Sequence, residues 1–227
     1  MSTVSPFAIS LLVVTAVGVS PARSQNVREP THAYHIAEIG RAAGVEPLWL
    51  ASPFPPGQRE VRLWDGFGLF EPQTFTQITS DGRSVRGRRI FWWTTATDSS
   101  AEAAMERDST LISNRELYEN LRGTAGCGPA WRHDDYEMCA VQLTPKESWA
   151  GILARLDSLG VGTLPDASTL SPPGASGLDG WGIVVEVLDG PVYSTYHYWM
   201  PDEDASQPEV RRAAAIVKVL AYIGYRE

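Results

Sequence analysis

Apolar side chains recur at helical spacing over residues 144–160 and predict an amphipathic helix there. Its expected start is Thr144, which can cap the helix, followed by Pro145, whose missing N–H is not needed at the first helical position. Glu147 can reach back to complete a capping box, and Gly160 follows the last apolar residue of the stripe. The pattern therefore predicts a helix that begins directly after Thr144.

Weaker helical patterns occupy four other stretches of the chain. Residues 206–223 repeat the same capping logic and predict a terminal helix, and residues 34–43 predict a short one. Two more helices are expected over 101–108 and 111–122, in a polar stretch before the cysteines.

Alternating apolar and polar residues predict strands over 59–67, 74–79 and 85–95. The Asp-Gly pair at 81–82 favours a hairpin turn, because the central positions of such a turn require positive φ. Three successive strands joined in this way predict an antiparallel meander.

The clearest hairpin signal joins residues 180–188 to residues 191–199 through the Asp-Gly pair at 189–190. If those two residues form the turn, Glu186 lies opposite Tyr193, and successive side chains alternate between two faces. One face is strongly apolar, with cross-strand aromatic and β-branched pairs, and is expected to belong to the core.

The second face of this hairpin carries Tyr193, Thr195, His197 and Trp199. An exposed row of this kind could bind a protein partner or a sugar, because aromatic residues are common anchors of interfaces. The alternative is that another element of the fold simply covers this face.

Together these elements predict an α+β fold with a mostly antiparallel sheet, made of the meander and the C-terminal hairpin. The helices that follow Thr144 and Ser206 are expected to pack on one face of it. No repeat and no obvious linker interrupts the chain, so residues 25–227 are predicted to form one domain.

The N-terminal 24 residues resemble a secretory signal peptide rather than part of the fold. Residues 7–19 are uncharged and apolar, which is short for a membrane span, and small residues precede an expected cleavage after Ser24. However, the first six residues contain no Lys or Arg. The alternative is therefore an uncleaved segment that anchors the protein to a membrane, and otherwise we expect a periplasmic or extracellular protein.

Composition narrows the class of protein further. The chain has 227 residues, of which 43% are hydrophobic, so a globular fold is expected and fibrous or wholly disordered chains are excluded. Its formal net charge of −8 disfavours a general nucleic-acid binder, which needs a basic surface to meet phosphates.

Cys127 and Cys139 are the only cysteines in the sequence. An even number in a chain expected to enter an oxidising compartment predicts a disulfide within a loop. A pair of zinc ligands is the alternative, but the two residues lack the short C-x(2–4)-C spacing of most zinc sites.

Two histidine-containing clusters are candidates for chemistry. His133 is followed by Asp134 and Asp135, which could form an acid–base or metal site, although a solvated loop would have the same composition. His32 and His35 would share one face of a helix, as in some zinc sites, but they lie close to the expected N-terminus of the mature chain.

Four arginines, Arg83, Arg86, Arg88 and Arg89, form a local basic cluster in an acidic protein. Guanidinium groups can bind a phosphate or carboxylate with two hydrogen bonds each, so the cluster is a candidate anion site. The alternative is a charged edge strand that resists aggregation.

The sequence contains no nucleophile elbow, no H-E-x-x-H zinc motif and no phosphate-binding glycine loop. We therefore expect a non-catalytic exported module that uses no cofactor and binds a protein or cell-envelope component through an aromatic-rich surface. Two alternatives stay open: an exported hydrolase that uses His133 with Asp134 or Asp135, and an accessory subunit of a membrane complex that keeps its N-terminal segment.

Overall fold

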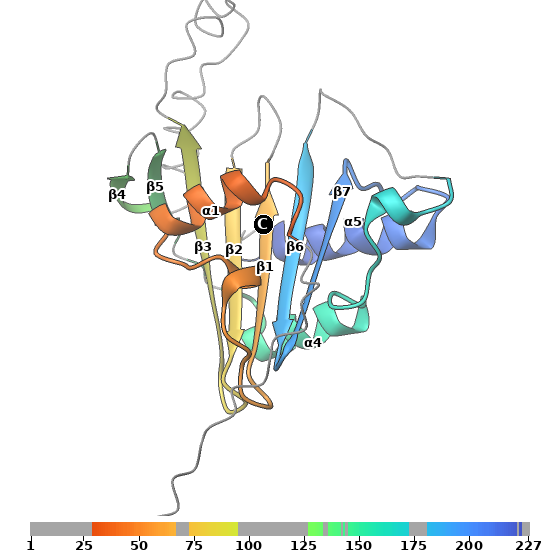
Figure 1. Cartoon of the computed structure of the whole chain (residues 1–227), viewed down its shortest axis with the longest axis horizontal. Helices are drawn as coiled ribbons and strands as arrows, with labels where there is room; N and C mark the ends of the chain where they lie inside the picture. Colours follow the sequence, from red (N-terminus) through yellow and green to blue (C-terminus); the bar gives the residue numbers. More distant parts are fainter. Residues whose placement is uncertain are drawn as a thin grey trace, which may run out of the picture.

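The protein is built on one seven-stranded antiparallel sheet with the strand order β4-β5-β3-β2-β1-β6-β7 (Figure 1). The computed structural model describes residues 29–66, 73–94, 127–133, 136–141, 143, 145–172, 181–221 and 223. The strands are β1 (Arg59–Asp65), β2 (Gln73–Ser80), β3 (Val85–Thr94), β4 (Cys127–His133), β5 (Tyr136–Val141), β6 (Gly182–Asp189) and β7 (Val192–Trp199). The helices within these ranges are α1 (Ala33–Ala42), α4 (Trp149–Ser158) and α5 (Pro208–Ala221), with 3-10 helices η1 (Leu48–Leu50) and η2 (Ala167–Thr169).

This architecture confirms the predicted α+β fold, including the meander β1-β2-β3 and the hairpin β6-β7. None of the helices in the described ranges is long and apolar enough to cross a membrane. The expected signal segment 1–24 and the expected helices 101–108 and 111–122 lie outside the described residues.

Helices cover both faces of the sheet (Figure 1). The α4/α5 face takes its name from the two helices that pack on it, and its core includes Val61, Leu63, Val185, Leu156 and Ala213. That these helices share one face was predicted. The α1 face is the opposite one, where α1 and η1 cover Trp64, Phe75, Ile90, Met138 and Val184. No placement of the first helix was predicted.

Helix α4 starts later than its sequence predicts. Its first residue is Trp149 and its cap is Ser148, whose Oγ accepts a hydrogen bond from the N–H of Gly151 at 3.1 Å. The predicted cap at Thr144 is therefore wrong, because Ser148 offers the same capping chemistry nearer to the packed part of the helix. Glu147 binds Arg155 on the next turns instead of closing a capping box.

The position of α4 depends on a close approach to the sheet. A side chain at Gly87 of β3 would overlap the ring of Trp149. Glycine therefore lets the start of α4 pack directly on the backbone of the strand, which accounts for the absence of a side chain at this position.

The register of the β6-β7 hairpin differs by two residues from the predicted one. Asp189 pairs with Val192, so Gly190 and Pro191 form the turn, and Glu186 lies opposite Thr195 rather than Tyr193. Gly190 has a φ of 54°, which suits the first central position of a hairpin turn. A shift of two residues leaves every side chain on its predicted face, so only the predicted cross-strand partners are wrong.

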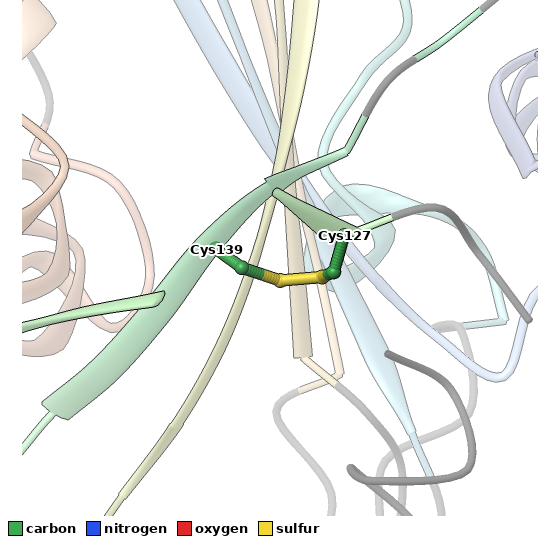
Figure 2. Close-up of a disulfide and its surroundings, with 2 residues drawn as sticks. All are labelled: Cys127 and Cys139. Carbon is green, nitrogen blue, oxygen red and sulfur yellow. A yellow bond between two sulfur atoms is a disulfide. The ribbon is translucent and has the colours of Figure 1, made fainter. Parts of the chain in front are cut away.

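The segment between the cysteines is a β-hairpin rather than the predicted loop. Strands β4 and β5 pair with each other, and β5 also pairs with β3, so this hairpin extends the sheet at its outer edge. Cys127 and Cys139 form the predicted disulfide across the hairpin, with 5.7 Å between their Cα atoms (Figure 2). Cys139 is fully buried beside Phe91, so the bond joins the new edge of the sheet to a small apolar cluster.

Candidate functional site

The β7 row consists of Tyr193, Thr195, His197 and Trp199, which alternate along β7 and face the α1 side of the sheet. β7 is the last strand of the sheet, and all four side chains are partly exposed. The structure therefore places these four predicted binding residues in one row, in which each side chain is partly buried and partly accessible to solvent.

Part of the outer edge of β7 is already occupied by the chain itself. The N–H of His197 donates to Asp166 Oδ2 at 2.9 Å, and the hydroxyl of Tyr198 donates to the carbonyl of Pro165 at 2.9 Å. The segment before η2 thus takes up the backbone N–H of His197, at which another strand could otherwise pair. A ligand of the β7 row would therefore meet its side chains rather than add a strand at this point.

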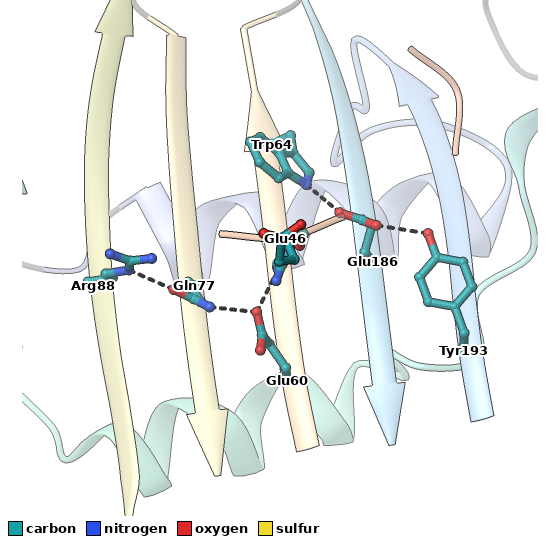
Figure 3. Close-up of polar contacts among 8 residues, drawn as sticks. Glu46, Glu60, Trp64, Gln77, Arg88, Glu186 and Tyr193 are labelled. Carbon is teal, nitrogen blue, oxygen red and sulfur yellow. Dashed lines mark hydrogen bonds and ion pairs between the residues drawn. The ribbon is translucent and has the colours of Figure 1, made fainter. Parts of the chain in front are cut away.

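A buried carboxylate lies beside the β7 row, on the neighbouring strand β6 (Figure 3). Glu186 of β6 is fully buried, and its two oxygens accept hydrogen bonds from Trp64 Nε1 at 2.6 Å and from the Tyr193 hydroxyl at 2.9 Å. Burial raises the pKa of Glu186, while the nearby Arg62 and the two hydrogen bonds act in the opposite direction. Glu186 therefore fixes the position of the Tyr193 hydroxyl from the neighbouring strand.

The polar contacts continue across the sheet towards β3 (Figure 3). Glu60 Oε1 accepts hydrogen bonds from Arg62 Nε and from Gln77 Nε2, each at 2.5 Å. Gln77 in turn accepts from Arg88 Nε at 2.6 Å, and Arg62 also donates to the carbonyl of Glu46 at 2.7 Å. Each of these buried or half-buried charges thus has a partner of opposite charge or a polar neighbour.

A second residue of the β7 row, His197, is also held by a contact within the protein. Its ring meets His32 edge-to-face, with 5.6 Å between ring centroids, and its Nε2 is buried with no hydrogen-bond partner among the described residues. Gly182 leaves room for this arrangement, because a Cβ there would lie 3.1 Å from both His197 Nε2 and the ring of Trp199. The packing of these two side chains therefore depends on a glycine at the neighbouring position of β6.

The predicted metal candidates His32 and His35 lie at the start of α1. His32 is the residue before the helix and contacts His197, whereas the exposed ring of His35 contacts Tyr34 at 5.6 Å between centroids. Within the described ranges, no group of three His, Cys, Asp or Glu side chains could hold a metal ion.

The predicted hydrolase candidate His133 lies at the end of β4 and pairs with Tyr136. Asp134 and Asp135 lie outside the described residues. The structure thus places His133 at the tip of a hairpin but provides no geometry for its two predicted partners.

The four arginines of the predicted anion site do not share one surface. Arg83 lies in the turn after β2, Arg86 and Arg88 lie on the α1 face of β3, and Arg89 is buried on the opposite face. Arg88 donates to Gln77 and Arg89 to Thr76. Because side chains alternate along a strand, neighbouring arginines in the sequence point away from each other.

Two open pockets of about 260 and 410 Å³ lie near the turns of the meander and of the β6-β7 hairpin, and both are lined by Arg59. Arg86 lines the smaller one, while Asp157 and Asp189 line the larger one. The guanidinium of Arg59 lies 2.5 Å from Asp157 and 3.7 Å from Asp189. Its positive charge is thus already compensated, and the larger pocket offers no excess of charge to an anion.

Sequence reasoning placed Glu186 on the correct face but did not identify it as a buried acceptor. The available signal was a single charged residue within an otherwise apolar strand, which indicates a carboxylate with partners inside the fold. The partner Trp64 lies on β1, so it could be identified only once the pairing of β1 with β6 was known.

Comparisons with known proteins found no matching family model, no matching curated protein and no matching solved structure.

Proposed function

We propose that the protein is an exported, non-catalytic module that binds a protein or cell-envelope component through the β7 row. The observation that carries the proposal is the arrangement of Tyr193, Thr195, His197 and Trp199 as one partly exposed row on the last strand of the sheet. Aromatic side chains on a rigid surface are effective anchors, because they bury a large area while losing little conformational entropy.

Contacts that fix two of these side chains strengthen this proposal. Tyr193 is held by Glu186, and His197 is packed against His32, so two of the four side chains have defined positions before any partner binds. A surface that is ordered in advance loses less entropy on binding than a mobile one.

Export is part of the same proposal. The disulfide between Cys127 and Cys139 is typical of oxidising compartments, and the apolar segment 7–19 has the length of a signal-peptide core. The intact mass of the protein recovered from outside the cytoplasm would test it: cleavage after Ser24 is expected. An uncleaved mass in the membrane fraction would instead favour an anchored accessory subunit.

Site-specific photocrosslinking would test the binding surface. A photoreactive residue at Thr195 is expected to form one discrete adduct in cells that produce the protein, whereas the same group at Ala154 is expected to form none. Ala154 is an exposed residue of α4 and lies on the opposite side of the sheet, so it controls for random collisions.

Trp199→Ala in the Thr195 reporter provides the matched loss-of-binding variant. We expect it to remove the adduct while leaving the circular dichroism spectrum and the thermal midpoint close to those of the reporter, because Trp199 is only partly buried. Equal adducts at positions 195 and 154, or an adduct that persists without Trp199, would contradict the proposed surface.

A further inference from the structure

Two histidines from distant parts of the sequence meet where α1 begins. His32 is the residue immediately before α1, and its ring contacts His197 of β7 with 5.6 Å between centroids and 71° between ring planes. The contact joins the residue that precedes the helix to the last strand of the sheet. It is thus one of the contacts that hold the N-terminal end of α1 on the α1 face.

The backbone at His32 is unusual and is consistent with a constrained position. Its φ of 62° and ψ of 28° lie in the left-handed region, which residues other than glycine rarely adopt, and its side chain makes no capping hydrogen bond to the helix. The side chain is directed to the contact with His197 rather than to the usual role of a helix cap.

The surroundings of the pair favour neutral imidazoles. Burial lowers the pKa of both rings, and His35 of α1 lowers that of His32 further. The charge of His32 also lowers the pKa of His197, whereas Asp166, from the segment before η2, raises it. In addition, the amide dipoles at the start of α1 disfavour a positive charge at this end of the helix.

We propose that the His32–His197 contact is a pH-operated latch, which holds the start of α1 against β7 while both rings are neutral and releases it when they take up protons. Two imidazolium ions at this separation repel each other, and each loses hydration in its half-buried position. Protons bind more readily to the open form, so acidification shifts the population towards it. The latch does not depend on the proposed binding function, since it is a property of the isolated protein.

The sign of the effect follows from linkage. The folded-state pKa of each ring lies below the unfolded value of 6.5, so the closed form binds fewer protons than the open one. The latch is therefore closed above about pH 6.5 and loses stability progressively as the pH falls below that value.

Amide hydrogen exchange in the full chain would test the latch at two matched positions. The N–H of Ile36 bonds to the carbonyl of His32 at 3.0 Å in the first turn of α1, and the N–H of Ile152 bonds to the carbonyl of Ser148 at 3.0 Å in the first turn of α4. Between about pH 7.5 and about pH 5.5, we expect the protection factor of Ile36 to fall at least about tenfold more than that of Ile152.

Three variants separate the latch from a general effect of acid. His197→Phe keeps an aromatic ring and His32→Asn tolerates the left-handed backbone, so both should abolish the extra loss of protection at Ile36. His35→Asn removes a histidine that lies outside the contact but lowers the pKa of His32, so the loss should become smaller without being abolished. Extra loss of protection that persists in both His197→Phe and His32→Asn would overturn the proposal.

A measurement on the wild-type protein keeps the test valid if a variant fails to fold. The ring signals of His32 and His197 in NMR spectra should titrate over the same pH range in which Ile36 loses protection. If the two rings take up protons while the protection of Ile36 stays unchanged, the latch does not exist. Photocrosslinking at Thr195 can fail without affecting this result, so the two proposals fail separately.

Discussion

The two faces of the sheet use the same strands in different ways. Towards α4 and α5, β1 and β6 present only aliphatic side chains at their centre, namely Val61, Leu63, Val185 and Val187. Towards α1, the intervening positions of these strands include Glu60, Arg62 and Glu186, all of which are buried. Both faces are buried at these positions, but one is stabilised by packing and the other also by polar pairing.

This difference predicts how each face responds to substitution. An apolar position loses stability in proportion to the volume removed, whatever the pH. A polar position depends on whether every donor and acceptor keeps a partner, and on the protonation state of the carboxylates. The following predictions test this contrast, from the largest expected effect to the smallest.

Leu156→Ala should cause the largest loss of stability, because Leu156 is fully buried at the centre of the α4/α5 face. We expect the free energy of unfolding to fall by about 3–5 kcal/mol, as for other buried leucines. Urea denaturation at several pH values would measure it, and the loss should not vary with pH. Leu153→Ala, at a partly exposed position of the same helix, should cost clearly less. Equal losses at the two positions would show that this face is not tightly packed.

Removal of the disulfide tests the part of the α4/α5 face where Cys139 packs beside Phe91. Replacing Cys127 and Cys139 together with serine should lower the free energy of unfolding by about 3 kcal/mol, by the loop-entropy argument. Chemical denaturation of the variant and of the reduced wild-type protein should give similar midpoints. A variant as stable as the oxidised protein would mean that pairing with β3 alone secures the β4-β5 hairpin.

Glu186→Leu tests the polar face directly. The substitution leaves the N–H of Trp64 and the hydroxyl of Tyr193 without their acceptor, at a cost of about 2–3 kcal/mol in unfolding free energy. Glu186→Gln is the matched control, since its amide can accept from Trp64 and donate to Tyr193. Chemical denaturation near pH 7 should show Glu186→Gln at least as stable as the wild type. If the leucine variant were as stable as the glutamine variant, the hydrogen bonds of Glu186 would contribute nothing to stability, and the contrast between the two faces would be wrong.

The pH dependence of Glu186 is expected to be the smallest and most specific effect. Burial raises the pKa of Glu186 above its ordinary value of 4.5, so the folded state stays protonated to a higher pH than the unfolded state does. Stability conferred by the protonated form is thus complete below about pH 4.5 and declines as the pH rises from there towards the folded pKa.

Comparison of wild type with Glu186→Gln isolates this titration from all others. The variant should gain stability relative to wild type as the pH rises from about 4.5, with a slope of at most about 1.4 kcal/mol per pH unit for one proton. Leu156→Ala should show no such trend against wild type. A constant difference between wild type and Glu186→Gln would mean that the carboxylate is stabilised by Arg62 as strongly as burial destabilises it.

Much of the fold followed from local patterns along the chain. The alternation in β6 and β7 assigned each side chain to its face, because that assignment requires only the two-residue period of a strand. The disulfide followed from the number of cysteines and the expected compartment. The boundaries of local elements were less predictable, since Thr144 and Ser148 are both good caps and packing selected the second.

The hairpin turn shows where local information ends. Both Asp189-Gly190 and Gly190-Pro191 are acceptable turn pairs, so sequence alone favoured the commoner Asp-Gly form. In the structure, Gly190 and Pro191 form the turn. The N–H of Gly190 then donates to the carbonyl of Gln58, and the carbonyl of Gly190 accepts from the N–H of Phe54. The register was thus decided by hydrogen bonds to a segment more than a hundred residues earlier in the chain.

The candidate site shows the same division. By itself, the sequence determined that Tyr193, Thr195, His197 and Trp199 share a face, because a strand alternates whatever surrounds it. Only the tertiary structure decided that Glu186 holds Tyr193 and that His32 meets His197, because each contact joins segments whose proximity depends on strand order and helix packing. Periodicity is a property of neighbouring residues, whereas the partner of a buried polar group is chosen by the whole fold.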